Sequence, residues 1–427
     1  MLAWLGLLTI VALLFLVMSK KMAAVVALII VPIVTALLGG FTTEIATFIT
    51  DGLKSIAPTG VMFIFAILFF GILTDAGTFK PLIRALLKFA GNNPSRVAVA
   101  TALLAMAVHL DGSGAVTFLV TIPALLPLYD TLQMKRTTLA TIAALAAGTM
   151  NILPWGGPTI RAATALEVNV TELFNPLLIP VIGGLLTVLV IAYILGKRER
   201  VNKGADIDVI AREQETDTKL ERPRLYYFNI ALVLVAVGVL ISGIAPPHII
   251  FMIAFSISLL VNYPNPKEQG ERINAHAKAA LLMASILFAA GCFTGILKGS
   301  GMINAMAESA VTYIPDTIGS HLAVITGVLS MPASLLFDPD SYYFGILPLL
   351  STTASHFGVE AIEVGRASII GQMTTGFPVS PLTGSTYLLI GLTGIELGDH
   401  QKKTIPLAFL VTMVILVLSL MIGAISW

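Results

Sequence analysis

The sequence predicts an all-α polytopic membrane protein. Of its 427 residues, 56% are hydrophobic and only 11% are charged, whereas roughly 25% of the residues of a soluble domain are charged. The mean hydropathy is +0.92. Apolar stretches close to the ~20 residues that span a hydrocarbon core recur from Trp4 to Trp427. They are longer and more uniformly apolar than the ~10-residue alternating segments of outer-membrane barrels, so we interpret them as helices.

The composition and motifs exclude several other classes of protein. The recurring spans are unlike a removable leader, which is one short apolar segment followed by a cleavage site. The single cysteine, Cys292, rules out an intramolecular disulfide framework and a cysteine-rich metal site. No nucleic-acid signature and no Walker motif is present, so neither nucleic-acid binding nor ATP-driven transport is supported. We expect no resident cofactor.

A charged segment divides the apolar spans into two halves. Residues 198–224 are polar and lack apolar periodicity, so we expect a linker there between a first half, 1–197, and a second half, 225–427. Asp75, near the end of a span, is expected to be solvated. The continuous spans are predicted at 2–18, 22–40, 59–75, 175–196, 226–244, 247–263, 279–297 and 404–425.

Four further apolar regions are interrupted. Regions 97–129 and 321–357 each have a polar centre, and we predict that they are re-entrant hairpins. Regions 137–168 and 364–395 are long enough to span, but each contains two prolines within five residues, in Pro154-Trp-Gly-Gly-Pro158 and Phe377-Pro-Val-Ser-Pro381. Proline lacks an N–H and clashes with the preceding turn, so both helices should be broken near the midplane. Such backbone survives at membrane depth only inside protein or beside a wet cavity.

The basic residues predict the orientation. When the spans are threaded alternately through a bilayer, the lysines and arginines collect on one side, except Lys54, Lys298, Arg366 and Arg161, which lies within a span. Cytoplasmic loops attract these residues. We therefore expect a bacterial inner (plasma) membrane protein with a cytoplasmic linker and both termini outside. The first hairpin then enters from the cytoplasm and the second from outside.

The two halves resemble each other. Gly71-Ile-Leu-Thr-Asp-Ala-Gly77 is echoed by Gly295-Ile-Leu-Lys-Gly-Ser-Gly301, and Pro154 and Thr159 match Pro378 and Thr383 at the same offset. Each half has five spans and one hairpin, so the second half must be inserted upside down. Inverted repeats with broken helices in matching positions are typical of secondary transporters with a site near the midplane.

The two hairpin tips carry the first group of candidate residues. Asp111 and Ser113 stand between glycines at the first tip, where they would line a ligand site or merely cap the following helix. Asp338, Asp340 and Ser341 stand at the second tip, where carboxylates suit a hard cation or a proton. Solvent-exposed turn residues are the alternative for this second group.

The broken helices carry the second group. Thr159, Ser380, Thr383 and Ser385 follow or line the breaks, so their hydroxyls can converge with freed backbone amides. Arg161 suits a substrate carboxylate, although an ion pair with Asp111 or an interfacial position would also explain it. Asn151 precedes the first break and is either a ligand or a helix cap.

At these residues the chain resembles the CitMHS family of citrate–divalent metal:proton symporters. The resemblance covers nearly the whole chain. The chain departs from the family pattern at both tips, where Asp-Gly-Asp-Gly and Ser-Asn-Asp are frequent. The likeness rests on Leu110-Asp-Gly-Ser-Gly, Leu125-Leu-Pro-Leu-Tyr129, Asn151-Ile-Leu-Pro-Trp-Gly-Gly-Pro-Thr-Ile-Arg-Ala-Ala163, Asp340-Ser-Tyr-Tyr-Phe-Gly-Ile-Leu-Pro348 and Gly398-Asp-His-Gln-Lys402.

The resemblance implies proton-driven import of citrate bound to Mg2+, Ca2+ or a related ion, by a protein that usually dimerises. It also implies that substrate binds at Asn151, Gly157, Thr159 and Arg161 in the first half, and at Ser380, Pro381 and Thr383 in the second.

Three alternatives remain open at this point. The first is a sodium- or proton-coupled carrier of other di- or tricarboxylates or of gluconate-like acids. The second is a membrane-embedded enzyme acting on lipids or isoprenoids, and the third is a channel.

Overall fold

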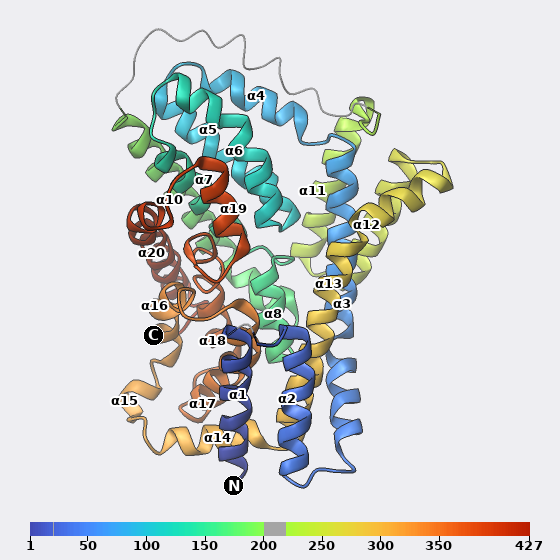
Figure 1. Cartoon of the computed structure of the whole chain (residues 1–427), viewed down its shortest axis with the longest axis vertical. Coiled ribbons are helices and arrows are strands. Elements are labelled where there is room, and N and C mark those ends of the chain that lie inside the picture. The colour runs from blue at the N-terminus through green and yellow to red at the C-terminus, as the bar shows by residue number, and fades with distance from the viewer. Residues whose placement is uncertain (20, 200–218) are drawn as a thin grey trace.

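The computed structural model describes residues 1–19, 21–199 and 219–427, and these residues form helices and connecting turns without a β-strand (Figure 1). The all-α prediction is therefore confirmed for this part of the chain. Six of its helices are long and apolar enough to cross a membrane, by length and composition. Of the predicted linker 198–224, residues 200–218 lie outside the described part.

Each predicted continuous span corresponds to one α-helix of the structure. Most of these helices end within a few residues of the predicted bounds, but the third and seventh begin well before residues 59 and 279. They are α1 (Leu2–Met18), α2 (Ala24–Leu38), α3 (Ile45–Asp75), α10 (Leu178–Lys197), α11 (Tyr226–Ser242), α12 (Pro247–Asn262), α13 (Pro266–Gly299) and α20 (Leu397–Met421).

The interrupted regions are pairs of shorter helices. In the first predicted hairpin, a 3₁₀ turn, His109–Asp111, joins the two helices. In the second, a π-helix, Ser341–Ile346, precedes the second helix. Residues 151–156 and 370–383 separate the two helices of each Pro-containing region. The pairs are α5 (Pro94–Val108) with α6 (Gly114–Thr131), α16 (Leu322–Ala333) with α17 (Leu347–His356), α7 (Arg136–Met150) with α8 (Gly157–Leu166), and α18 (Ala361–Ile369) with α19 (Gly384–Thr393).

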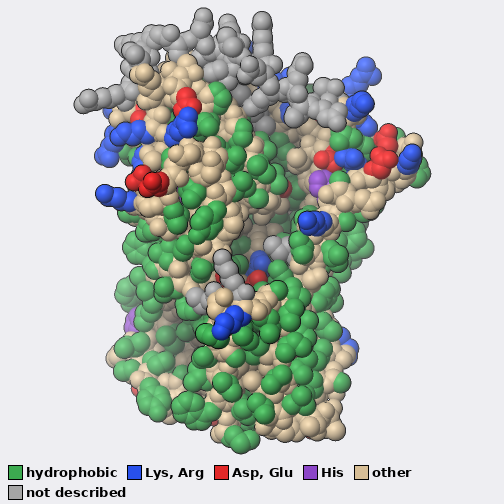
Figure 2. Space-filling model, in the orientation of Figure 1, with side chains coloured by type: hydrophobic (Ala, Val, Ile, Leu, Met, Phe, Trp, Pro, Cys, Tyr) green, Lys and Arg blue, Asp and Glu red, His purple; other side chains and the backbone are tan. Residues whose placement is uncertain are grey.

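The remaining helices are short and lie mainly at the two ends of the molecule. In Figure 1, α4 lies at the end where the linker attaches, and α14 lies at the opposite end with the N-terminus. Charged side chains gather at the linker end, whereas hydrophobic side chains dominate the rest of the visible face (Figure 2). These helices are α4 (Lys80–Ala90), α9 (Val170–Phe174), α14 (Met302–Val311) and α15 (Asp316–Gly319).

The two longest helices, α3 and α13, pack along each other in opposite directions (Figure 1). Gly52 near the start of α3 faces Gly291 and Gly295 near the end of α13. A Cβ added to Gly52 would lie 2.0 Å from the Gly291 carbonyl oxygen, and one added to Gly295 would lie 2.3 Å from the Phe48 carbonyl oxygen. The backbones therefore touch, as in membrane helix pairs built on small residues. This contact explains why α3 remains helical over residues 45–58, which include polar side chains and which hydropathy alone does not assign to a membrane span.

We predict that Gly295→Ala destabilises the protein, because the new methyl group must push the α3 and α13 backbones apart. Overpacking of this kind costs about 1–3 kcal/mol. Thermal unfolding of the purified protein in detergent measures the effect. Gly238→Ala in α11 is the control, since a Cβ there meets nothing within 4 Å. Equal losses of stability in the two variants would contradict the proposed contact.

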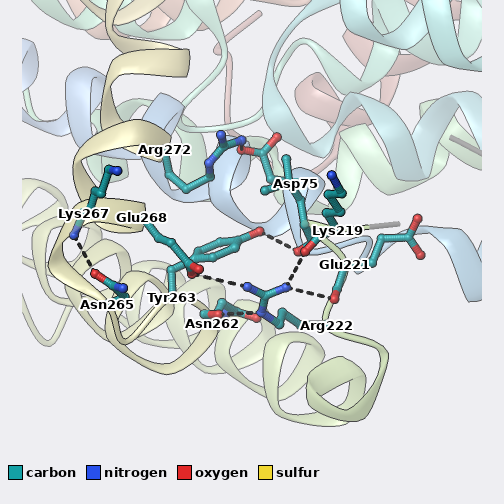
Figure 3. A network of polar contacts seen from close by, with 11 residues as sticks. Asp75, Lys219, Glu221, Arg222, Asn262, Tyr263, Asn265, Lys267, Glu268 and Arg272 are labelled. Atoms are coloured by element: carbon teal, nitrogen blue, oxygen red, sulfur yellow. Dashed lines mark hydrogen bonds and ion pairs between the residues drawn. The ribbon is translucent and has the colours of Figure 1, made fainter. Parts of the chain in front are cut away.

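A polar cluster joins the end of the linker to α3, α12 and α13 (Figure 3). The Arg222 backbone N–H donates to the Ala76 carbonyl oxygen at 2.9 Å, and its Nε donates to the Asn262 carbonyl oxygen at 2.8 Å. The guanidinium lies 4.7 Å from the centre of the Tyr263 ring. Arg222 therefore fixes the start of the second half to the end of α3.

Two neighbours complete this cluster. The Tyr263 hydroxyl donates to the Leu220 carbonyl oxygen at 2.9 Å. Asp75 pairs with Arg272 at 3.2 Å and lies 2.9 Å from His276 Nε2, with 18% of its side chain exposed. The expectation that Asp75 is solvated is wrong, because the extended start of α13 covers it.

We predict that Arg222→Ala lowers the thermal stability, since it leaves the Asn262 carbonyl without this donor and removes the contact with Tyr263. Loss of a partly buried hydrogen bond of this type costs about 1–3 kcal/mol. The matched control is Lys267→Ala, which removes an exposed side chain from the same region. Unchanged stability in Arg222→Ala would show that the cluster does not hold the two halves together.

Candidate functional site

The first tip is organised by local hydrogen bonds. The Asp111 carboxylate accepts from the Ser113 backbone N–H at 2.8 Å, and the Ser113 hydroxyl accepts from the Val116 backbone N–H at 3.3 Å. Ser113 is thus the N-cap of α6, so the capping interpretation is confirmed for this residue. The carboxylate of Asp111 thereby fixes the turn that leads into α6.

Asn151 connects three separate segments. Its Nδ2 donates to the Met373 carbonyl oxygen at 2.9 Å, which orients Oδ1 toward His109 Nε2 at 3.3 Å. With Oδ1 as acceptor, His109 Nε2 must be the donor. His109 is fully buried, and its Nδ1 lies 2.8 Å from the Thr117 hydroxyl. Asn151 therefore holds the first tip against both non-helical segments.

The second tip is tied to α8 by an ion pair. Arg161 Nε donates to Asp340 Oδ1 at 2.7 Å, and the two side chains are only 7% and 12% exposed. The pair considered from the sequence was with Asp111; the structure has Asp340 instead, because the second tip packs over α8. Asp340 is not an exposed turn residue, since it is buried. The pair joins residues from the two halves.

Asp338 and Ser341 lie beside this pair. Asp338 Oδ1 accepts from the backbone N–H groups of Asp340 and Ser341, both at 3.1 Å, and thereby caps the π-helix. Ser341 is 1% exposed. Neither residue matches the alternative of a freely exposed turn.

The predicted hydroxyl groups mostly donate to backbone carbonyl groups. Thr159 donates to Ile152 at 3.1 Å, Thr383 donates to Phe377 at 2.9 Å, and Ser380 donates to Ser334. Their protons are therefore engaged, and their remaining lone pairs are suited to a cation or to an N–H donor.

Helix N-termini supply anion-binding groups at both breaks. Gly157 begins α8 and lies against Arg161, whose Nη1 would be 2.9 Å from an added Cβ. Gly384 begins α19, which has no side-chain cap, and Ser385 follows it. The free amides of a helix N-terminus and its dipole favour an anion.

The first tip lies between these two helix starts. A Cβ at Gly112 would be 3.5 Å from the Trp155 carbonyl oxygen, and one at Gly114 would be 3.2 Å from the Ser385 hydroxyl. Pro381 is half-buried in the same segment as Ser380 and Thr383. The first tip therefore lies beside Trp155 of the first Pro-containing segment and beside Ser385, which follows the second.

Several residues of this region were not among the predicted ligands. Trp155 Nε1 donates to the Leu110 carbonyl oxygen at 2.7 Å, and the Phe377 ring stacks on His109 at 6.0 Å. Tyr343 donates to the Gln372 carbonyl oxygen at 2.7 Å. The sequence feature that could have identified these residues is their position, at or beside the hairpin tips and the Pro-containing breaks.

The space around α8 is divided in two. A cavity of about 330 Å³ lies between α3, the end of α8 and the loop before α12, and its lining includes Thr59, Glu167 and His248. The second space, lined by Phe63, Gly157, Ile160, Arg161 and Leu287, is too small to hold a water molecule. Figure 2 shows a hollow between the side formed by α6 and α19 and the side formed by α12 and α13.

Within the described residues, no three histidine, cysteine, aspartate or glutamate side chains are placed to hold a metal ion together.

The sequence matches a known family over most of its length. The model of the CitMHS family, described as citrate transporter, matches residues 8–371. A Bacillus subtilis (strain 168) protein named citrate transporter is 46% identical over 428 residues, and the match covers 100% of both chains. The chain belongs to the CitMHS family of citrate transporters. It is therefore a membrane transporter and not an enzyme.

A second relative agrees with this assignment, and two solved structures resemble the chain in fold. The Mg(2+)/citrate complex secondary transporter of the same organism is 42% identical, with 100% of this chain and 99% of that protein covered. The Alcanivorax borkumensis YdaH transporter has a TM-score of 0.62 at 15% identity, covering 91% of this chain and 89% of that one. Neisseria gonorrhoeae MtrF has a TM-score of 0.63 at 13% identity, covering 92% and 86%. These two likenesses show that this chain shares its fold with those two proteins.

We predict that Arg161→Gln and Asp340→Asn each destabilise this CitMHS transporter, because each breaks a buried ion pair. Breaking a buried pair costs about 3–5 kcal/mol. The double variant should recover much of the thermal stability. Lack of recovery in the double variant would contradict a direct Arg161–Asp340 pair.

Proposed function

We propose that this transporter imports citrate as its complex with a divalent cation of the Mg2+ or Ca2+ type, driven by protons. The metal ion is cargo here and not a resident cofactor. The relative named Mg(2+)/citrate complex secondary transporter, 42% identical across the chain, supports the substrate. The observation that carries the proposal is the buried Arg161–Asp340 pair beside the N-terminus of α8.

The charge of this region favours a chelated substrate. Arg161 already shares its charge with Asp340, so the region offers little net positive charge to free trivalent citrate. A citrate that carries a dication keeps only one net negative charge and costs less to desolvate. The amides at the starts of α8 and α19 then suffice for its carboxylates.

We assign the predicted residues to two roles. Ser113, Asn151, Gly157, Thr159, Arg161, Ser380, Pro381, Thr383 and Ser385 shape the substrate site. Of these, Arg161 and the helix N-termini contact carboxylates, whereas Asn151 positions the first tip. Asp111, Asp338, Asp340 and Ser341 serve metal sensing or proton coupling. A carboxylate at a buried tip can exchange a proton as its surroundings change.

We also propose the architecture in which these residues act. Residues 1–197 and 225–427 are inverted repeats joined by a cytoplasmic linker, and each has five spans and a re-entrant hairpin, with breaks at the midplane. The opposite directions of α3 and α13 support this, because they occupy corresponding places in the two halves. Both termini then lie outside the plasma membrane, and the protein is a homodimer, as the family resemblance implies.

The test is uptake of labelled citrate into proteoliposomes under an inward proton gradient, with Mg2+, Ca2+ or a chelator. We expect uptake to need a divalent ion and to collapse when the gradient is dissipated. Arg161→Lys keeps the charge but loses the planar donor fork, so uptake should fall about tenfold or more.

Lys54→Ala removes an exposed charge and serves as the control, with uptake expected at the unaltered rate. Uptake that persists in chelator would overturn the metal complex as substrate. Uptake that ignores the proton gradient would overturn the coupling.

A further inference from the structure

Two short helices, α4 and α14, follow the repeated glycine motif of the two halves. The last glycine of each motif, Gly77 in the first half and Gly301 in the second, has a positive φ, of 73° and 75°. The chain therefore turns in the same way before each helix. In Figure 1 the two helices lie across opposite ends of the molecule, at a steep angle to α3. If α3 spans the bilayer, a helix in this position lies near the plane of the membrane surface.

Both helices have a buried face and an exposed aromatic ring. Ala90 of α4 and Met302 and Met306 of α14 are buried. Phe89, near the end of α4, is 51% exposed, and Tyr313, which stands at the corresponding place just after α14, is 87% exposed. Aromatic rings are enriched where a protein crosses the boundary between lipid and water. The two rings therefore mark α4 and α14 as interfacial helices.

The exposed faces of the two helices differ in charge. Lys80, Arg84 and Lys88 recur every four residues in α4, so they share one face of the helix. The offset that relates Gly77 to Gly301 sets these three residues against exposed residues of the second half, Asn304, Glu308 and Thr312. A helix in this place therefore does not need basic residues on its exposed face in order to pack.

The basic residues at the end of α4 are not neutralised within the described part of the chain. Lys80 pairs with Glu221 at the start of α4, but the ion pairs formed by the described residues include none with Arg84, Lys88 or Arg96. The Arg96 guanidinium lies 6.0 Å from the centre of the Phe89 ring, so this third cation stands beside the end of α4. Like charges on neighbouring turns repel each other. We name Arg84, Lys88 and Arg96 the basic stripe.

The chemistry of the basic stripe fits the headgroup of an anionic phospholipid. A guanidinium binds a phosphate group through two parallel hydrogen bonds, and a lysine adds a compact positive charge. The exposed Phe89 ring beside these cations suits a surface in which acyl chains lie under a layer of phosphates. Basic segments next to membrane spans are attracted to the negative surface of the cytoplasmic leaflet.

We propose that the basic stripe binds the headgroups of anionic phospholipids, with the Phe89 ring inserted among their acyl chains. The placement in the cytoplasmic leaflet rests on the orientation proposed above, whereas the binding itself does not depend on the transported substrate. Because α4 joins α3 to α5, the bound lipid fixes the membrane depth at which the first hairpin begins.

The test measures which lipids surround α4 in the full-length protein. Phe89→Trp places a fluorophore beside the basic stripe, and the signal of the protein without this substitution, from Trp4, Trp155 and Trp427, is subtracted. The protein is reconstituted in phosphatidylcholine with a small fraction of phosphatidylglycerol. Bromine atoms, which quench tryptophan, are carried by the phosphatidylglycerol or by an equal amount of the phosphatidylcholine. Tyr313→Trp is the matched control on the other interfacial helix.

We expect brominated phosphatidylglycerol to quench the Phe89→Trp variant severalfold more than the same amount of brominated phosphatidylcholine. The preference should disappear at high salt, because the screening length falls to about 3 Å at 1 M. The Tyr313→Trp variant should show no preference, since its helix carries no basic stripe.

Two matched double variants locate the effect. Arg84→Gln with Lys88→Gln, in the Phe89→Trp background, should weaken the preference by about fivefold for each charge removed. Lys267→Gln with Lys402→Gln removes the same charge from exposed residues outside α4, on the side predicted to be cytoplasmic, and should keep the preference.

Three outcomes would overturn the proposal. The first is equal quenching of the Phe89→Trp variant by the two brominated lipids. The second is a preference that survives Arg84→Gln with Lys88→Gln, or that both double variants reduce equally. The third is a preference abolished by glycerol 1-phosphate at constant ionic strength, which would make a free phosphate the occupant. Citrate uptake is not measured in this test, so failure of the lipid site and failure of the proposed function are distinguishable.

Discussion

Backbone that departs from the α-helix inside an apolar protein must find hydrogen-bond partners within the protein, and this constraint organises the structure. Residues 151–156 and 370–383 lie among buried helices, where each unpaired backbone group is costly. Side chains from distant segments supply the partners. Asn151 reaches the Met373 carbonyl, Gln401 Nε2 reaches the Val379 carbonyl at 2.9 Å, and His400 Nε2 lies 2.8 Å from that of Pro378. The two interrupted segments are thus fixed in place by a hydrogen-bond network that also includes both hairpin tips.

This network explains why residues that look like ligands in the sequence are partly structural. Asn151 and Thr159 donate hydrogen bonds to backbone carbonyl groups, and Ser113 caps a helix. The groups that we assign to the substrate are therefore mainly the backbone amides at the starts of α8 and α19. Such a set is pre-organised, because the amides are fixed by the fold and need little rearrangement to receive an anion.

Much of the helix plan could be predicted from the sequence, because apolar stretches and paired prolines signal spans and breaks directly. The starts of α3 and α13 could not. The start of α3 lies beside Gly291 and Gly295 of α13, and the start of α13 lies beside Gly71 and Asp75 of α3, and hydropathy does not register such contacts. The burial of Asp75 was missed for the same reason, since its partners Arg272 and His276 belong to a helix far along the chain.

The candidate site shows the same limit. The sequence singled out Arg161 and Asp340 separately, but not that they pair, because the contact joins the two halves. Gln372 gave no signal at all, since one amide in an apolar run is usually a packing residue. The structure shows that Gln372 joins its segment to the second hairpin, through hydrogen bonds with Phe337 and Tyr343.

The account depends most on the claim that citrate travels with its metal. The direct measurement counts labelled citrate and Mg2+ accumulated by the same proteoliposomes under a proton gradient. Equal amounts of the two, entering at equal rates, are the predicted result. Citrate that accumulates without an equal amount of Mg2+ would contradict it.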